Sequence, residues 1–427
     1  MERDYLDPIL MPDLPQTAAR PARGVDERPS PEIAAILERA LAGEALRRDD
    51  GVRLIGCGPR DVGAVCAAAC VIRDRGRGRT VSFSPKVFIP LTRLCRDACG
   101  YCTFRTTPGS DPALYMTPDQ VLDVARRGEQ LGCTEALFTL GERPEQRFPE
   151  AREWLRHRGY RSTLGYLRDM AALVLAETAL WPHVNPGTLS EAEMASLRDV
   201  SASMGLMLET TSERLCAPGG PHEHAPSKHP RARLHTLEAA GRLRVAFTTG
   251  LLLGIGETPD ERVDTLLAIR DSHDRWGHVQ EVIVQNFRAK PKTPMGSSAE
   301  PDVGEVVRAA AVARLMLGST INIQVPPNLT ANGYPIYLSA GINDWGGISP
   351  VTIDFVNPEA PWPAIASLAA RTAEAGLTLR ARLPVYPEYL LYRPEYISPS
   401  LRPGLRAAAD KDGYAKGGFG SHAAAGS

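Results

Sequence analysis

Short apolar and β-branched runs alternate with amphipathic helical stretches along most of this 427-residue chain. Such alternation is typical of a parallel sheet whose strands are joined by crossover helices. We expect strands at Val87–Leu94, Ala136–Leu140, His183–Asn185, Leu206–Glu209, Val245–Leu253, Val279–Gln285, Ile321–Val325 and Ile342–Trp345. The helices expected between them include Pro118–Leu131, Glu191–Val200, Pro230–Ala240, Pro259–Arg275 and Val303–Leu317. Eight such units over about 260 residues match an α/β fold of the closed TIM-type (β/α)₈ barrel kind, with a doubly wound open sheet as the alternative.

The segments outside this central region differ from it in composition. Residues 1–28 and 408–427 are rich in Pro, Gly, Ala and Ser, so we expect both ends to be disordered. Between 29 and 80, apolar residues recur at helical spacing, which predicts N-terminal helices that pack on the barrel. Residues 81–407 would then hold the barrel and its C-terminal helices. Cys66 and Cys70, four residues apart on one N-terminal helix, are expected to be small buried side chains.

Charge and composition narrow the class of partner. A formal net charge of −1 and a pI near 6.8 give no electrostatic reason to expect nucleic acid, so we expect a small-molecule substrate. No run approaches the roughly 18 to 20 apolar residues that cross a bilayer, and the first residues do not resemble a secretory signal. Eight unevenly spaced cysteines do not resemble a disulfide framework, so we expect a cytoplasmic protein with reduced thiols.

The strongest chemical signal is a C-x₃-C-x₂-C run, Cys95, Cys99 and Cys102, directly after the expected first strand. Cysteine thiolates are the usual ligands of iron–sulfur clusters, and a four-iron cluster normally takes four of them. Three close thiolates leave one iron open, as catalytic metal sites do. The alternatives are a zinc site completed by a distant histidine, or an electron-transfer cluster completed by Cys133 or Cys216.

With Tyr101 at its aromatic position, this run resembles the C-x₃-C-x-aromatic-C signature of the radical S-adenosylmethionine (SAM) superfamily. The resemblance implies one [4Fe-4S] cluster held by the three cysteines, with the amino and carboxylate groups of SAM chelating the fourth iron. One-electron reduction would cleave SAM to methionine and a deoxyadenosyl radical, which takes hydrogen from the substrate. In this family the aromatic residue packs on the adenine.

Three further segments resemble cofactor contacts of that superfamily. Gly141 and Glu142 follow the second strand like the Gly-Gly-Glu turn that meets the methionyl amino group, although Leu140 replaces the first glycine. Glu209 ends the fourth strand, where the family contacts the ribose or the amino acid part of SAM; the alternative is a carboxylate that caps the next helix. At the end of the expected fifth strand, three residues resemble the family's glycine-rich stretch beside the adenine of SAM: Gly250, Gly254 and Glu257.

The resemblance sharpens to the CofG-type subunit of FO synthase, which completes the deazaflavin ring of coenzyme F420. It rests on KVFIPLTRLCRDACGYCTF, EALFTLGERPE, MLETTS, TTGLLLGIGET, HVQEVIVQNFRAK, PPNL and DWGGISP, from Lys86 to about Pro363. A second C-x₃-C-x₂-C run is absent, so this chain would perform half of the synthase reaction. A separate radical SAM subunit of the CofH type would supply its substrate, and a ferredoxin or flavodoxin would supply low-potential electrons.

That family implies an ammonia lyase reaction. The adduct 5-amino-5-(4-hydroxybenzyl)-6-(D-ribitylimino)-5,6-dihydrouracil would lose hydrogen to the deoxyadenosyl radical, cyclise and release ammonia. The product is 7,8-didemethyl-8-hydroxy-5-deazariboflavin (FO). The alternatives are another radical SAM enzyme, of the biotin synthase or tyrosine lyase type, and a non-catalytic iron–sulfur protein.

Polar residues near the ends of the late strands are candidates for binding the uracil and ribityl groups, because buried hydrogen-bonding groups must be matched. Each could instead be a helix cap or loop anchor. Glu209 and Asp344 are also acid–base candidates by their chemistry alone. Trp345 is expected in the core. The substrate-binding candidates are Gln285, Asn286, Arg288, Asn328 and Asp344.

Two charged clusters invite a functional interpretation that we do not favour. His222, His224 and His229 lie in a Pro-rich loop, PHEHAPSKHP, which we expect to be solvent-exposed and without a metal. The basic run Arg75, Arg77 and Arg79 precedes the expected barrel, and we expect a solvated turn there.

Overall fold

A computed structural model describes residues 28–110 and 113–417. Its parallel strands β1 to β8 close into a barrel, because β1 pairs with β2 through Lys86–Pro90 and with β8 through Ser82–Pro85. The predicted (β/α)₈ barrel is therefore confirmed, and the open sheet is excluded. The strands are β1 (Thr80–Pro90), β2 (Glu135–Thr139), β3 (Trp181–Asn185), β4 (Ser203–Gly205), β5 (Phe247–Leu253), β6 (Val279–Asn286), β7 (Asn322–Gln324) and β8 (Asp344–Ile348).

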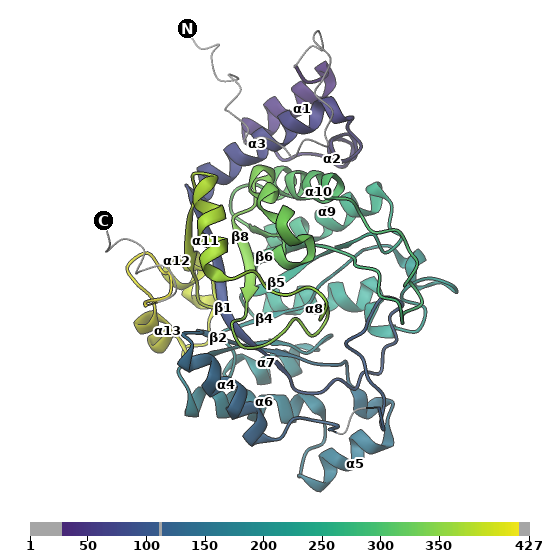
Figure 1. The fold of residues 1–427 in the computed structure, drawn as a ribbon, viewed down its shortest axis with the longest axis vertical. Helices are drawn as coiled ribbons and strands as arrows, with labels where there is room; N and C mark the ends of the chain where they lie inside the picture. Colours follow the sequence, from purple (N-terminus) through teal and green to yellow (C-terminus); the bar gives the residue numbers. More distant parts are fainter. Residues whose placement is uncertain (1–27, 111–112, 418–427) are drawn as a thin grey trace.

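Helices cover the outside of the barrel (Figure 1), and the predicted ones lie within two residues of their expected bounds. Thr117, Ser190 and Thr258 each begin a helix as an N-cap whose side chain accepts from the third backbone N–H, in a reciprocal capping box. These helices are α4 (Pro118–Gln130), α5 (Pro149–His157), α6 (Thr163–Glu177), α7 (Glu191–Arg198), α8 (Pro230–Arg242), α9 (Pro259–Trp276) and α10 (Val303–Leu317). Short 3₁₀ turns lie at Pro144–Gln146, Glu213–Cys216, Pro226–Lys228 and Pro394–Tyr396, and a longer 3₁₀ segment spans Pro327–Ala340.

Three strands depart from their expected bounds by more than two residues. β1 begins at Thr80 rather than Val87, because its first half pairs with a strand far along the chain. β4 ends at Gly205, and the expected strand residues after it lead into a turn where Glu209 has φ of 66°. β8 begins at Asp344 and continues past Trp345 through two glycines, which gave no apolar signal in the sequence.

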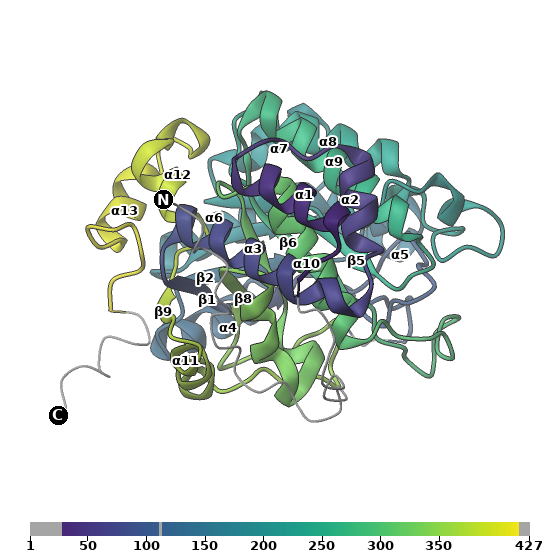
Figure 2. The same ribbon diagram turned by 90° about the horizontal axis from the view of Figure 1, so that it is seen from above.

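The N-terminal helices α1 (Pro31–Leu41), α2 (Arg48–Ile55) and α3 (Pro59–Arg77) lie against α9 and α10 (Figures 1 and 2). Cys66 is buried, as expected, whereas Cys70 is half-buried and its thiol donates to the Ser339 carbonyl at 3.2 Å. The basic run is not simply solvated, because Arg77 ends α3 and pairs with Glu388 at 2.8 Å.

The C-terminal segment closes the barrel at the amino ends of its strands. An unpredicted ninth strand, β9 (Thr378–Ala381), pairs with β1, and the residues after it enter the barrel, where Ser203 and Gln280 donate to the Pro384 carbonyl at 2.7 and 3.1 Å. Around it lie α11 (Ile365–Glu374), α12 (Pro387–Tyr392) and α13 (Arg402–Ala408).

The expected disorder of the C-terminal tail is wrong for residues 408–417, where Ala409 and Ala415 form a bridge and Tyr414 packs beneath Arg380. The remainder of that prediction, residues 418–427, lies outside the described residues, as do 1–27 of the N-terminal segment. In the described part of the chain, none of the helices has both the length and the apolar character needed to cross a membrane.

Candidate functional site

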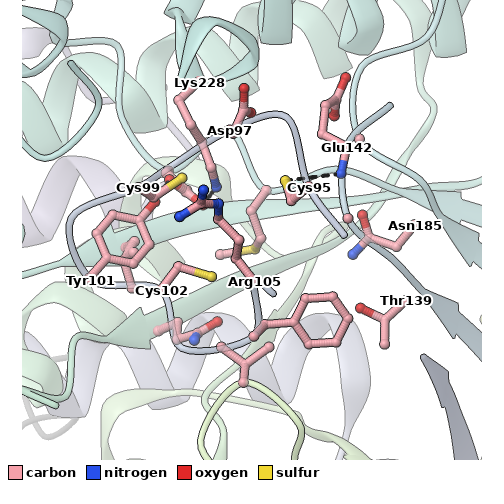
Figure 3. A pocket seen from close by; sticks show the side chains of 18 of the residues that line it. Cys95, Asp97, Cys99, Tyr101, Cys102, Arg105, Thr139, Glu142, Asn185 and Lys228 are labelled. Carbon is pink, nitrogen blue, oxygen red and sulfur yellow. Dashed lines mark hydrogen bonds and ion pairs between the residues drawn. The ribbon is translucent and has the colours of Figure 1, made fainter. Parts of the chain in front are cut away.

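A cavity of about 280 Å³ opens among the carboxyl ends of the strands, and Cys95, Cys99 and Cys102 all line it. Figure 3 shows their side chains pointing into this space together with Lys228 and Arg105. Thr139 at the end of β2 and Asn185 at the end of β3 line the same cavity. We call this end of the molecule the barrel mouth; it is where enzymes of this architecture carry their active sites.

Backbone hydrogen bonds fix the cysteine loop on both sides. The Ala98 N–H donates to the His224 carbonyl and the Gly100 N–H to the Pro221 carbonyl, both at 2.8 Å. On the other side, the Arg96 N–H donates to the Glu142 carbonyl at 2.8 Å. The three thiols are therefore placed by a loop that the rest of the mouth holds rigidly.

The three thiols are free and two of them are resistant to ionisation in the protein alone. Burial raises the pKa of Cys95 to about 11 and that of Cys99 to about 12. Metal binding deprotonates such thiols, so loading the site would release protons. The Glu142 N–H already donates to the Cys95 sulfur at 3.1 Å, a bond that a thiolate strengthens. Among the described residues, no three or more His, Cys, Asp or Glu side chains are grouped closely enough to hold a single metal ion.

Glu209 is the centre of a buried polar cluster beside Cys99. Its carboxylate accepts from the Tyr101 hydroxyl at 2.5 Å, lies 3.2 Å from His222 Nε2 and forms an ion pair with Lys228. Burial alone would raise the pKa of Glu209, but Lys228, Arg233 and His222 hold it well below its usual range. This carboxylate therefore stays ionised and can only accept hydrogen bonds.

The cluster corrects the prediction that the histidine loop is solvent-exposed. His222 is buried, because the loop folds back over the cysteine loop. His224 does remain exposed, and His229 caps α8 by accepting from the Arg231 N–H. Nothing in the loop's composition distinguished His222 from its neighbours.

Gly141 and Glu142 both line the cavity. A Cβ on Gly141 would lie 1.9 Å from the Leu94 carbonyl oxygen, so the close approach of this turn to the cysteine loop requires glycine. The Glu142 carboxylate points away toward Thr188, accepting from its hydroxyl at 2.6 Å and its N–H at 3.0 Å. Burial raises the pKa of Glu142. The backbone of this turn, rather than its carboxylate, faces the cysteines.

Gly250, Gly254 and Glu257 do not line the cavity. A Cβ on Gly250 would lie 2.2 Å from the Ile283 carbonyl oxygen, so this glycine lets β5 and β6 pair closely. The Glu257 carboxylate accepts from the Gly254 N–H at 2.8 Å and pairs with Arg262 at 2.7 Å. These contacts give the motif a structural role in the turn after β5.

The predicted substrate residues divide into two groups. Gln285, Asn286 and Arg288, at and after the end of β6, line the cavity. Asn328 does not; it donates to Asp354 at 3.0 Å and anchors a loop.

Asp344 was placed wrongly, because it begins β8 instead of ending it and so lies at the opposite end of the barrel. Its carboxylate accepts from Ser82 at 2.5 Å and pairs with Arg382 at 2.8 Å. It is therefore neither a substrate ligand nor an acid–base candidate at the mouth. Trp345 is fully buried, as expected of a core residue.

The sequence gave no indication of several other cavity residues. Lys228 lies in the histidine loop, and it lines the cavity only because that loop folds over Cys99. Arg105 and Lys290 also line the cavity. Arg105 follows the cysteine run and Lys290 follows the end of β6, but nothing in the adjacent sequence indicated that their side chains point inward.

Comparison with known proteins agrees with this geometry. Residues 89–269 match the model of the Radical SAM superfamily. Over 336 residues the chain is 51% identical to the 7,8-didemethyl-8-hydroxy-5-deazariboflavin synthase of Methanopyrus kandleri, which covers 79% of this chain and 100% of that protein. This chain belongs to the 7,8-didemethyl-8-hydroxy-5-deazariboflavin synthase family. It is also 50% identical over 391 residues to the FO synthase of Mycobacterium tuberculosis, covering 88% of this chain but only 46% of that longer protein.

Two solved structures share the fold of this deazariboflavin synthase family member. The FeFe-hydrogenase maturase HydG from Carboxydothermus hydrogenoformans has a TM-score of 0.69 at 17% identity, over 86% of this chain and 82% of that one. Methylornithine synthase (PylB) has a TM-score of 0.64 at 17% identity, over 81% and 97%. At these identities the likeness establishes the barrel alone.

Enzymes of the Radical SAM superfamily use a [4Fe-4S] cluster and SAM, and the residues at the mouth fit both. Three free thiols border one cavity, and a backbone N–H already donates to one of the sulfurs. Neither Cys133 nor Cys216 lines that cavity, so neither is placed to complete the cluster. A fourth iron would thus be left for SAM, which disfavours the closed electron-transfer site.

Proposed function

We propose that this protein catalyses the ring-closing step that forms FO, with release of ammonia, in coenzyme F420 biosynthesis. The substrate would be 5-amino-5-(4-hydroxybenzyl)-6-(D-ribitylimino)-5,6-dihydrouracil. The observation that carries the proposal is the 51% identity with a deazariboflavin synthase over the whole of that protein, together with three free cysteines at one cavity. The chain spans less than half the length of the actinobacterial FO synthases, so a separate radical SAM subunit would supply the adduct.

Each part of the mouth has a distinct task in this proposal. Cys95, Cys99 and Cys102 hold the cluster. When bound, the cluster and SAM supply the deoxyadenosyl radical that removes hydrogen from the adduct. The ionised Glu209 accepts hydrogen bonds from the ribose or amino group of SAM, and its contacts with Tyr101 and Lys228 fix its orientation.

The remaining candidate residues lie in the turn after β2, at and after the end of β5, and at the end of β6. The backbone at Gly141 and Glu142 meets the methionyl amino group, and Gly250, Gly254 and Glu257 shape the loop that borders the adenine. Gln285, Asn286 and Arg288 bind the uracil and ribityl groups. A low-potential donor of the ferredoxin or flavodoxin kind would supply the electron that a bound cluster needs.

A biotin-synthase-like reaction is the second candidate, but sulfur insertion calls for an additional cluster. The cysteines outside the C-x₃-C-x₂-C run are Cys57, Cys66, Cys70, Cys133 and Cys216, and none of them lines the cavity. Nothing at the mouth therefore favours that reaction over ring closure.

The test is a turnover assay on the full chain, reconstituted anaerobically with iron and sulfide. The reduced protein receives SAM with the adduct, whose amino group carries ¹⁵N. We expect deoxyadenosine, fluorescent FO and ¹⁵N-labelled ammonia in equal amounts. Deoxyadenosine without FO or labelled ammonia would point to a different radical SAM reaction. The absence of all three products would contradict the proposal altogether.

A further inference from the structure

Five cationic side chains line the cavity, and three of them have partners in the protein. Lys228 pairs with Glu209, and Arg288 pairs with Glu300 at 3.0 Å. Arg233 donates to the backbone carbonyls of Ser227 and Met207. The charge of these three side chains is thus already matched or solvated by peptide oxygens.

Arg105 and Lys290 have no such partners. Neither side chain makes a hydrogen bond or ion pair with another residue in 28–110 or 113–417, and the Arg105 Nε is buried without an acceptor. Arg105 belongs to the cysteine loop, three residues after Cys102, and Figure 3 shows it pointing into the cavity with the three thiols. Its charge is placed to offset the thiolates. Lys290 comes from the segment after β6, and Glu359, Cys102 and Asp354 lie close enough to favour its charge without forming an ion pair with it.

Lys290 is held in a place that is unfavourable for a lone cation. Only 7% of the residue is exposed, and burial lowers the pKa of its ammonium group. Its backbone carbonyl accepts from the Thr293 N–H and hydroxyl at 3.0 and 2.9 Å, so the turn fixes its position. The ammonium of this mostly buried side chain borders the cavity without a partner, and a ligand that brings an oxygen acceptor would supply one.

Asn286 presents the complementary group. It ends β6, it is 5% exposed, and its Oδ1 is buried with no donor. A buried amide oxygen without a donor is unusual in a folded protein. Among the described residues of the cavity, Lys290 thus leaves its ammonium unmatched, and Asn286 leaves its amide oxygen and amide nitrogen unmatched.

The imide edge of a uracil ring carries a carbonyl oxygen directly beside an N–H, which is the complementary pattern. We propose that Lys290 and Asn286 read this edge of the substrate, Lys290 donating to a ring carbonyl and Asn286 Oδ1 accepting from the ring N–H. The inference rests on the proposed function and adds Lys290 as a specificity-determining residue. It needs no chemical step, because it concerns binding alone.

The experiment measures FO binding by its fluorescence, first with cluster-free protein and then with reconstituted protein. Lys290→Gln removes the charge but keeps a similar length, and Lys290→Arg keeps the charge. Lys292→Gln is the control, because Lys292 is exposed two residues away. An FO analogue methylated on the ring N–H tests Asn286 in the same assay. Iron content and deoxyadenosine yield report on the cluster separately.

We expect Lys290→Gln to weaken FO binding about 10- to 100-fold, the usual effect of losing a charge-assisted hydrogen bond, and Lys290→Arg to restore part of it. N-methylation should weaken binding to the wild type but make no difference to Asn286→Ala. Unchanged FO binding by Lys290→Gln, or lost iron with unchanged FO binding, would overturn this inference only. Failure of the wild type to bind or form FO would overturn the proposed function instead.

Discussion

The two ends of the barrel both bury charged side chains, but they treat them differently. At the barrel floor, which we define by Lys86, Glu135, Glu281, Asp344 and Arg382 near the amino ends of the strands, every one of these groups has an ion-pair partner. At the mouth, the three thiols, Arg105, Lys290 and the Asn286 oxygen have no ion-pair or hydrogen-bond partner among the described residues, apart from the Glu142 N–H that meets Cys95. Buried groups that satisfy one another stabilise a fold, whereas unmatched ones at a cavity mark where a ligand binds.

The largest expected effect is a loss of activity when a cysteine at the mouth is replaced. Cys99→Ala removes one of three cluster ligands, so iron content should fall and FO and deoxyadenosine should both drop to the background of cluster-free protein. The free energy of unfolding of the cluster-free protein should change little. Cys133→Ala is the control, a buried cysteine outside the cavity, and should keep full iron content. Radical products from Cys99→Ala would break the distinction between the two ends.

The second prediction concerns stability at the barrel floor, whereas the first concerns activity at the mouth. Arg382→Met leaves the carboxylates of Asp344 and Glu281 buried without their cation, so it should lower the free energy of unfolding by about 3–5 kcal/mol. Arg380→Met should cost about 1 kcal/mol or less, because Arg380 pairs with half-exposed Asp410 and Asp412. Urea unfolding of both variants makes the measurement. Equal effects would show that the floor network is not what closes the barrel.

A smaller effect is expected from acid. Burial alone would raise the pKa of Glu135, but Lys86, His183 and Arg382 lower it to about 2. Because the folded pKa lies below the unfolded one, near 4.5, this carboxylate adds stability above pH 4.5 that is lost as the pH falls toward 2. Between pH 5 and pH 3 the wild type should lose about 2 kcal/mol more than Glu135→Gln in urea unfolding. Parallel pH profiles would contradict the low pKa.

The sequence predicted the mouth better than the floor. The cysteine spacing and the turn at Gly141 are local signals, so they were recognised even though the end of β1, before the cysteines, was placed four residues too late. Asp344 shows how much depends on such an end: a strand that starts at this residue instead of passing it moves the carboxylate from one end of the barrel to the other.

Long-range packing accounts for the other failures. β9 is short and partly exposed, and it pairs with β1, where Thr378 lies opposite Thr80, 298 residues earlier, so no local pattern revealed it. His222 and Lys228 gain their importance only because their loop covers Cys99. Lys290 is notable for the absence of a partner, which composition and periodicity do not report.

Mössbauer spectroscopy of ⁵⁷Fe-reconstituted protein, with and without SAM, tests most directly whether three cysteines leave one iron open at the mouth. We predict a [4Fe-4S] cluster in which one iron of the four changes its isomer shift when SAM is added, while the other three do not. If the four irons stay equivalent when SAM is added, or if the protein takes up zinc in place of a cluster, the claim of an open iron at the mouth is contradicted.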